Sequence, residues 1–234
     1  FTAIENLSFD LYRGETLGLV GESGSGKSTL GYSLMNLIEK AKGEIYFENR
    51  LISNLNKKEL RELRKDIQII FQNPYSSLNP RIRIGEALEE VLKVHKIGNN
   101  SKERKEEVIK MLERVGLEKE HYNRYPHEFS GGQRQRIGIA RSLLLRPKIV
   151  ICDESVSALD VRVQAQILSL LNELKKEFSL TYIFITHDLG VVRFMSDRIM
   201  VMQRGEIVEM ERTDKLFENP QTQYTQKLIS SIPN

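Results

Sequence analysis

The stretch Gly21-Glu-Ser-Gly-Ser-Gly26-Lys27-Ser28 decides the fold of this chain. It fits G-x-x-x-x-G-K-[ST], a pattern whose glycines let backbone N–H groups and the N-terminus of a helix surround phosphate oxygens. An apolar run directly before it, Thr16 to Val20, is predicted as a buried strand, and a helix is predicted directly after it. A glycine-rich turn that binds nothing is the alternative, but the flanking strand and helix favour a phosphate loop. Lys27 is then expected to reach the β- and γ-phosphates of a nucleotide, and the Ser28 hydroxyl to ligate Mg²⁺.

Apolar runs with the length and β-branched content of buried parallel strands recur along the chain. They are Thr16 to Val20, Ile67 to Phe71, Lys148 to Cys152 and Thr181 to Thr186. Helical patterns separate them. The clearest is Val161 to Phe178, which carries its apolar residues on one face and has Asp160 as its expected N-cap. Alternating strands and helices predict an α/β fold with a mainly parallel sheet.

Two regions depart from this alternation. Ile4 to Leu11 and Gly43 to Phe47 are predicted as antiparallel strands of a small β-lobe. Asn73 to Leu145 lacks a convincing strand and contains helical runs. Among these are Ile84 to Ile97 and Lys102 to Val115, the second ended by Gly116. We therefore predict one domain over residues 1–234, with an α/β core and β-lobe at 1–72 and 146–234 and an inserted helical subdomain at 73–145.

Composition excludes several classes of protein. Lys and Arg total 35 against 32 Asp and Glu, so the net charge is only +3, and we expect no nucleic-acid partner. The single cysteine, Cys152, excludes an intrachain disulfide and is expected to be a small buried hydrophobe. No stretch of the sequence approaches the ~20 apolar residues of a membrane-spanning helix, so another polypeptide must supply any membrane part. Because the chain begins at Phe1 and not at a methionine, we expect a fragment or a trimmed form.

Further polar groups follow the predicted strands. Asp153 and Glu154 end one strand, while Gln72 and His187 follow two others. Taken singly, an acidic pair is commonly a solvated loop, and a lone His or Gln carries little information. Because the carboxyl ends of strands in an open α/β sheet form the ligand-binding edge, all four are expected at one site. There Asp153 would help to hold Mg²⁺ and Glu154 would polarise the water that attacks the γ-phosphate.

A second candidate for anion binding is Phe129-Ser130-Gly131-Gly132-Gln133, which precedes a predicted helix, Arg134 to Leu145. An ordinary capped helix start is the simpler interpretation. However, the chain would then have two phosphate-binding elements and one set of catalytic groups. One solution is that this second element completes the site of a partner subunit.

In their order and spacing, these elements and Ser157-Ala-Leu-Asp160 resemble the nucleotide-binding subunits of ABC transporters, over essentially the whole chain. Further segments of the sequence are similar to the ATP-binding subunits of oligopeptide and dipeptide importers. These segments are Phe71-Gln-Asn-Pro-Tyr-Ser-Ser-Leu-Asn-Pro-Arg81, Tyr125-Pro-His-Glu-Phe129, Ser157 to Gln166, Tyr224-Thr-Gln and Ser231-Ile-Pro233. Asn73 to Arg81 resembles the second of the two non-identical ATPases in such systems.

The resemblance implies an ABC-type P-loop NTPase with a RecA-like core, and a site that takes ATP and Mg²⁺. The implied catalytic residues are Glu154, His187 and Lys27. The implied metal ligands are Ser28, Gln72 and Asp153. The implied nucleotide-binding residues are Gly21, Glu22, Ser23, Gly24, Ser25, Gly26, Lys27, Ser28, Thr29, Gln72, Ser130, Gly131, Gly132, Gln133 and Asp160. His187 would sense the γ-phosphate.

The resemblance also implies partners. In a head-to-tail dimer of identical or non-identical subunits, ATP would lie between one subunit's residues 21–28 and the other's 130–133, with Asp160 contacting the opposite subunit. Two membrane permeases would contact the chain near Tyr75 to Pro80, where a groove would receive a short helix of the permease. An extracytoplasmic binding protein would select the substrate. The chain is thus expected at the cytoplasmic face of the cell membrane.

The sequence departs from the family pattern in three places. Ser155 replaces the common proline after the catalytic Glu, and Phe129 replaces the commoner leucine. The resemblance implies an aromatic residue that stacks on adenine upstream of the β-lobe, where Phe1 is the one candidate, and it stays open whether that residue is missing from this chain. Three other functions stay open: an ABC-type ATPase acting on nucleic acid or ribosomes, an exporter ATPase and a non-catalytic regulatory module. Within import, the substrate stays open among oligopeptide, dipeptide, nickel chelate and glutathione.

Overall fold

A computed structural model describes residues 4–5, 7–38, 42–72 and 78–231 of the chain. The backbone divides into two compact units. Unit 1 comprises Phe1–Ile67 and Thr181–Asn234, and unit 2 comprises Gln68–Leu180. The predicted boundaries at 72/73 and 145/146 stay a prediction.

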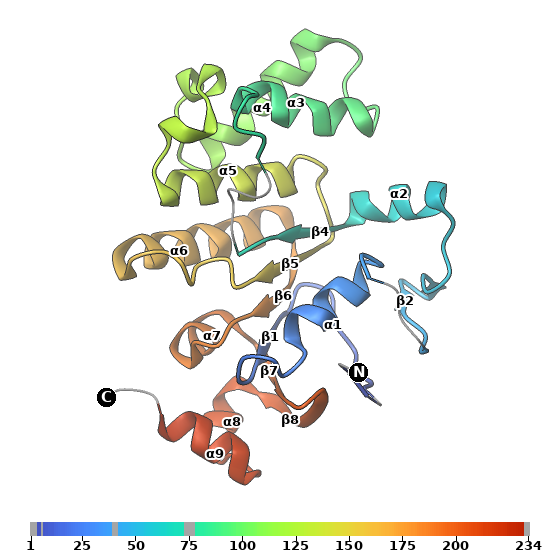
Figure 1. The fold of residues 1–234 in the computed structure, drawn as a ribbon, viewed down its shortest axis with the longest axis vertical. Coiled ribbons are helices and arrows are strands. Elements are labelled where there is room, and N and C mark those ends of the chain that lie inside the picture. The colour runs from blue at the N-terminus through green and yellow to red at the C-terminus, as the bar shows by residue number, and fades with distance from the viewer. Residues whose placement is uncertain (1–3, 6, 39–41, 73–77, 232–234) are drawn as a thin grey trace. The chain divides into compact units, whose positions relative to one another are not determined.

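Unit 1 is built around strand β1 (Thr16–Val20), which is buried along its whole length. β1 pairs in parallel with β6 (Thr181–Ile185) on one side and with β7 (Arg198–Gln203) on the other. β8 (Glu206–Arg212) then pairs antiparallel with β7, so the order in this unit is β6-β1-β7-β8 (Figure 1). The strands predicted at 16–20 and 181–186 are confirmed, and the sheet is mainly parallel.

The C-terminal helices cover the end of β1. Three short helices follow β6: α7 (Leu189–Met195), α8 (Thr213–Glu218) and α9 (Gln223–Ser230). Leu189, Val192 and Leu216 from α7 and α8 are buried with Val20 of β1 in one apolar cluster. Partly buried side chains of α9 pack against the same cluster. Burying a side chain of this size stabilises the fold by about 1.5–3 kcal/mol, so the C-terminal segment is a structural part of the core.

Close packing of α7 on β1 depends on Gly18. A Cβ atom at this position would lie 2.1 Å from Val192 Cγ2 and 2.4 Å from Ser196 Oγ. Real Cβ contacts of that length do not occur, so only glycine lets the helix approach the strand this closely.

The predicted β-lobe is present, but one of its strands was wrongly predicted. The pairing is between β2 (Tyr46–Phe47) and β3 (Arg50–Leu51), joined by Glu48 and Asn49 at φ 49° and 64°. Two central residues with positive φ give a tight two-residue hairpin, so β2 is paired locally and needs no distant partner. The described part of the predicted strand Ile4 to Leu11 is not a strand. Instead, the backbone N–H of Glu5 bonds the Gly205 carbonyl at 3.1 Å.

Two helices complete the described elements of unit 1. α1 (Lys27–Leu34) follows the glycine-rich loop after β1. α2 (Lys57–Asp66) begins with a capping box, in which Asn56 accepts the N–H groups of Lys58 and Glu59.

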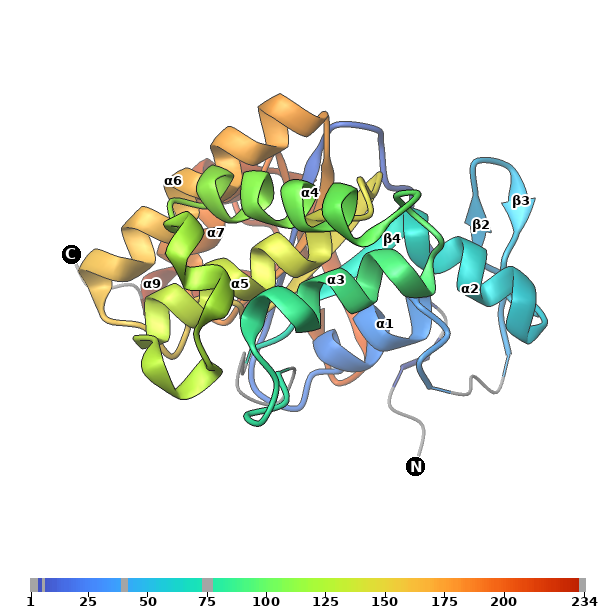
Figure 2. The same ribbon diagram turned by 90° about the horizontal axis from the view of Figure 1, so that it is seen from above.

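Unit 2 consists of two neighbouring strands and a group of helices. β4 (Ile67–Ile70) lies beside β5 (Ile149–Asp153). The helices are α3 (Ile84–Val94), α4 (Ser101–Arg114), α5 (Gly131–Leu143) and α6 (Val161–Phe178), with short 3₁₀ turns η2 (Lys119–Asn123) and η3 (Pro126–Glu128). Figure 2 shows α3, α4 and α5 next to one another. Residues 78–145 contain helices and no strand, as predicted for the helical subdomain.

Gly116 ends α4 as predicted. It has φ 76°, its N–H bonds the Glu113 carbonyl at 3.0 Å, and the Leu117 N–H bonds the Leu112 carbonyl at 2.9 Å. This pair of reversed bonds is the Schellman ending, which needs a left-handed residue.

Two expectations from composition also have an outcome. Cys152 is fully buried in β5, and burial raises the pKa of its thiol to about 12. In the described parts of the chain, no helix is both long enough and apolar enough to cross a membrane.

Candidate functional site

The predicted phosphate loop joins the end of β1 to the start of α1. Gly21, Gly24 and Gly26 have φ of 150°, 80° and 102°, and α1 begins at Lys27. A Cβ at Gly21 would lie 2.1 Å from the Met202 carbonyl oxygen. Because Gly26 has no side chain to cap the helix, the first N–H groups of α1 receive no side-chain cap from it. The loop therefore has the backbone form of an anion-binding site.

The side chain of Lys27 is held by the loop itself. Its ammonium donates to the carbonyl oxygens of Gly21 at 2.8 Å and Glu22 at 2.9 Å, and lies 3.4 Å from Ser25 Oγ. The residue is 6% exposed. A buried cation fixed over this loop supplies the positive charge that phosphate binding needs.

The loop is also fastened from the C-terminal segment of unit 1. The Glu22 N–H donates to Tyr224 Oη at 3.0 Å, and the Gly205 N–H donates to the Ser25 carbonyl at 3.0 Å. Tyr224 belongs to the Tyr224-Thr-Gln stretch, and the sequence alone assigns it no role. The contact spans 202 positions of the chain, so no local pattern could have revealed it.

His187 lies at the same sheet edge as the loop. It follows β6, whose Ile185 is the parallel partner of Leu19 on β1, and its side chain is exposed. The neighbouring Asp188 caps α7 by accepting the Val191 N–H at 3.1 Å. In unit 1, residues 21–28 and His187 thus follow neighbouring parallel strands at the same sheet edge, and their shared role in one site stays a prediction.

In unit 2 the residues predicted after β4 and β5 meet. Gln72 Nε2 donates to Glu154 Oε2 at 2.9 Å and lies 3.4 Å from Ser157 Oγ, which in turn donates to the Glu154 carbonyl at 3.0 Å. Glu154 has φ 46°, a left-handed conformation that costs a non-glycine residue about 1–2 kcal/mol. Asp153, the last residue of β5, is buried. The arrangement holds one carboxylate in a fixed orientation just beyond a strand end.

The second predicted anion-binding element is a capped helix start. Ser130 Oγ accepts the Gln133 N–H at 3.3 Å, and Gln133 Oε1 accepts the Ser130 N–H at 2.9 Å. A Cβ at Gly132 would lie 2.5 Å from Val163 Cγ1, so glycine lets α5 begin directly against α6. Asp160 caps α6, as predicted, by accepting the Val163 N–H at 3.0 Å. The helix start is thus capped, as the simpler interpretation predicts, and a role in binding phosphate stays a prediction.

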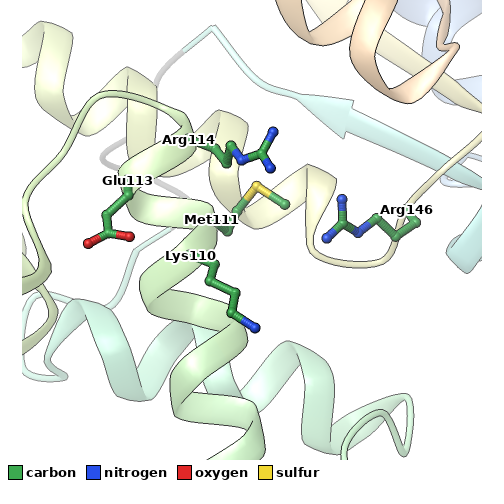
Figure 3. Close-up of a pocket in the computed structure, with 5 residues that line it drawn as sticks. All are labelled: Lys110, Met111, Glu113, Arg114 and Arg146. Carbon is green, nitrogen blue, oxygen red and sulfur yellow. The ribbon is translucent and has the colours of Figure 1, made fainter.

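Unit 2 also contains a pocket of about 370 Å³ away from these residues (Figure 3). It is lined by Lys110, Met111, Glu113, Arg114 and Arg146. Arg146 pairs with Glu107 at 2.7 Å and Arg114 pairs with Glu177. No predicted site residue lines this pocket.

Some sequence expectations lie outside the described residues. They concern Phe1, positions 75–77 of the predicted permease-facing segment, and positions 232–233 of the stretch Ser231-Ile-Pro233.

Comparison with known proteins covers nearly the whole chain. Residues 4–157 match the ABC transporter family. The chain is 53% identical over 232 residues to the oligopeptide transport ATP-binding protein OppF of Bacillus subtilis (strain 168), covering 99% of this chain and 76% of the relative. It is 54% identical over 231 residues to the glutathione import ATP-binding protein GsiA of Salmonella paratyphi A, covering 99% of this chain but only 37% of that relative.

Solved structures give the same result. The ATP-binding cassette MJ0796, a dimer in a post-hydrolysis state bound to ADP and Pi, matches with a TM-score of 0.80 and 32% identity over 90% of each chain. The cbiO1 protein of Clostridium perfringens, part of the ABC transporter complex cbiONQ, matches with a TM-score of 0.83 and 29% identity over 93% of this chain and 84% of that one.

A mainly parallel sheet with a glycine-rich phosphate loop after a buried strand defines a nucleotide-binding α/β protein of the P-loop class. Within that class, the chain belongs to the ABC transporter family. The predicted fold and the predicted resemblance to peptide-importer ATPases are confirmed.

Proposed function

We propose that the chain binds and hydrolyses ATP to energise an ABC-type importer of oligopeptides or dipeptides. One observation carries the proposal. A phosphate loop with a buried, loop-held lysine occurs in a chain that is 53% identical to an oligopeptide transport ATPase over 99% of its length. The similarity to GsiA makes glutathione, itself a small peptide, the second candidate substrate.

The phosphate loop binds the nucleotide. Backbone N–H groups of residues 21–29 surround the phosphates at the N-terminus of α1, while the Lys27 ammonium reaches the β- and γ-phosphates. The Ser28 hydroxyl, the Gln72 amide oxygen and the Asp153 carboxylate are the proposed ligands of Mg²⁺.

This ligand set fits the metal. The groups offer hard oxygen ligands, which Mg²⁺ prefers. Mg²⁺ is usually held by one or two protein groups together with phosphates and water, so three protein ligands at most are needed here. When bound, Mg²⁺ offsets negative charge on the phosphates.

Glu154 is the proposed general base. It accepts a proton from the water that attacks the γ-phosphate, and the products are ADP and inorganic phosphate. Gln72 orients the carboxylate through the 2.9 Å hydrogen bond. The proposed role of His187 is to contact the γ-phosphate.

Assembly follows from the same roles. Two ATP-binding subunits, identical or not, form a head-to-tail dimer in which Ser130 to Gln133 and Asp160 of one subunit complete the nucleotide site of the other. Two permeases and an extracytoplasmic binding protein complete the importer, which places the chain peripherally at the cytoplasmic face of the membrane. No nucleic-acid partner is proposed.

The test is an affinity pull-down of the tagged chain from detergent-solubilised membranes of its own cells, with the tag alone as control and mass spectrometry to identify partners. We expect two multi-spanning permeases, an ATP-binding subunit and a secreted binding protein. Recovery of ribosomal or DNA-repair proteins without a membrane partner would overturn transport. Recovery of permeases with no binding protein would overturn import.

The substrate is then determined on the recovered binding protein by titration with dipeptides, oligopeptides and glutathione. Tight binding of either peptide class supports the first candidate. Binding of glutathione alone replaces it with the second.

A further inference from the structure

We propose that Tyr224 on α9 is a positioning residue for the phosphate loop, and that α9 thereby sets the affinity for nucleotide. The proposal rests on the proposed binding of ATP at residues 21–28. Tyr224 Oη accepts the backbone N–H of Glu22 at 3.0 Å. This bond is the one direct side-chain link that the described C-terminal helices make to the backbone of the loop.

The bond acts on a peptide group that is already bound on its other side. The carbonyl oxygen of Gly21 accepts the Lys27 ammonium at 2.8 Å, and the N–H of Glu22 donates to Tyr224. This C=O and this N–H belong to one planar amide. Bonds at both ends of the amide fix its rotation, although Gly21, at φ 150°, has a conformation in which glycine is otherwise free to turn. Tyr224 therefore also fixes the carbonyl that holds Lys27.

The phenol has a rigid support. α9 begins after Thr222, which with Gln221 donates three hydrogen bonds of 2.8–3.1 Å to the carboxylate of Glu209 on β8. The Tyr224 side chain packs on the cluster that contains Val20, the residue directly before the loop. The position of the Tyr224 hydroxyl is thus fixed in two ways: the start of α9 is bonded to β8, and the ring packs on the cluster that contains Val20.

A second contact fastens the far side of the loop. The Gly205 N–H, in the turn between β7 and β8, donates to the Ser25 carbonyl at 3.0 Å. This bond is between backbone atoms and is kept when a side chain changes. Removing the Tyr224 hydroxyl therefore takes away one of the two bonds that fix the Gly21–Glu22 amide, while the bond at Gly205 is kept.

The test compares Tyr224→Phe with the matched control Tyr46→Phe. Both substitutions remove one phenol oxygen and keep the ring. Tyr46 is exposed on the β2–β3 hairpin, where its hydroxyl bonds Glu44 at 2.9 Å. ATP affinity is measured by calorimetry, together with KM, kcat and thermal unfolding.

We expect Tyr224→Phe to raise the Kd for MgATP and the KM about three- to tenfold, the range for losing one hydrogen bond. kcat should change less than twofold, because bound phosphates reorder the loop before chemistry. Tyr46→Phe should match the wild type. Unchanged Kd and KM in Tyr224→Phe, or equal losses in both variants, would overturn the proposal.

Hydrogen exchange separates positioning from folding. In the nucleotide-free state, Tyr224→Phe should accelerate exchange at residues 21–28 and leave β1 and α9 protected. Equal acceleration across unit 1 would show a structural role only and overturn the inference. A wild-type chain that fails to bind ATP would instead overturn the proposed function, so the two failures are distinct.

Discussion

Glu154 shows how one residue combines a strained backbone with a fixed side chain. Its left-handed φ of 46° turns the chain sharply after β5, and Gln72 holds its carboxylate. Strain of this kind persists where surrounding bonds determine the conformation, and it is concentrated at functional sites. The positions of Glu154 and Gln72 after strands could be predicted from the sequence. Their direct hydrogen bond could not, because it depends on which strands become neighbours.

Replacing Glu154 with Gln should retain ATP binding and lower turnover by about 10²–10⁴-fold, the usual contribution of a general base. The amide oxygen of the new side chain can still accept the hydrogen bond from Gln72, so the geometry is kept while the base is lost. Steady-state phosphate release and calorimetry measure the two effects. Lys27→Ala is the contrasting variant, expected to lose binding itself. Near-normal turnover in Glu154→Gln would contradict the role given to this carboxylate.

The position of Tyr224 marks the limit of prediction at the residue scale. A tyrosine near the end of a chain has no spacing that relates it to a loop 202 positions earlier. Residues that bind phosphate through backbone groups are recognisable because glycines must occur at particular places. A residue that supports such a loop from a distant element carries no comparable pattern.

Among the elements, those whose apolar pattern repeats over many residues were predicted best. The helix at Val161–Phe178 has the predicted bounds, because its apolar face repeats over 18 residues and Asp160 caps it. β2 and β3 are only two residues long, and their pairing depends on the positive φ of Glu48 and Asn49. No sequence pattern indicates positive φ at these two residues, so the prediction of Ile4 to Leu11 as the strand beside β2 is wrong.

β7 and β8 were not predicted at all. A turn with positive φ at Arg204 and Gly205 joins them, and β8 carries Glu209 and Glu211 among its apolar residues. The apolar run Ile199 to Met202, followed by Gln203-Arg204-Gly205, is the signal that could identify this hairpin.

Docking of α9 should depend on pH through Glu209. Burial raises the pKa of this carboxyl, but hydrogen bonds from Gln221, Thr225 and Thr222 outweigh it, so the pKa lies below its ordinary value of 4.5. A depressed carboxyl pKa stabilises the folded state above the ordinary value, and this stabilisation is lost as pH falls through the folded pKa. Protection of α9 amides, corrected for intrinsic exchange, should therefore fall below pH 4.5 in the wild type.

Glu209→Gln should show weaker protection of α9 with little dependence on pH in that window. Glu206→Gln, an exposed change on the same strand, is the control and should behave as the wild type. A steep acid-induced loss that persists in Glu209→Gln would assign the effect to another group.

For the whole molecule, the sequence predicted the fold class and the family, because a few motifs in fixed order constrain both. The transported substrate could not be predicted, since the proposed site residues contact the nucleotide and not the transported molecule. The partner subunit could not be predicted either, because a helix start such as Ser130 to Gln133 looks the same whether it only caps α5 or also completes a neighbouring site.

ATP should join two copies of the Glu154→Gln chain into a dimer, detectable by light scattering as a doubling of mass in MgATP and not in ADP. Adding Gly131→Asp should abolish the dimer and leave each chain folded. A Cβ at Gly131 meets only Leu159 Cδ2, at an ordinary 3.6 Å, while the new carboxylate would repel the partner's nucleotide. A dimer that survives this change would contradict the proposed role of residues 130–133. A Glu154→Gln chain that stays monomeric would contradict self-association.

The sheet order of unit 1 has a consequence for synthesis on the ribosome. β1 is made before both of its neighbours, β6 and β7, and before the groups that fasten the phosphate loop at Gly205 and Tyr224, all of which lie after residue 180. A nascent chain that has emerged only through α6 therefore has an apolar strand without its sheet neighbours, a condition that favours aggregation. The nucleotide loop is thus made before the segments that fasten it, and it takes its final form only after they follow.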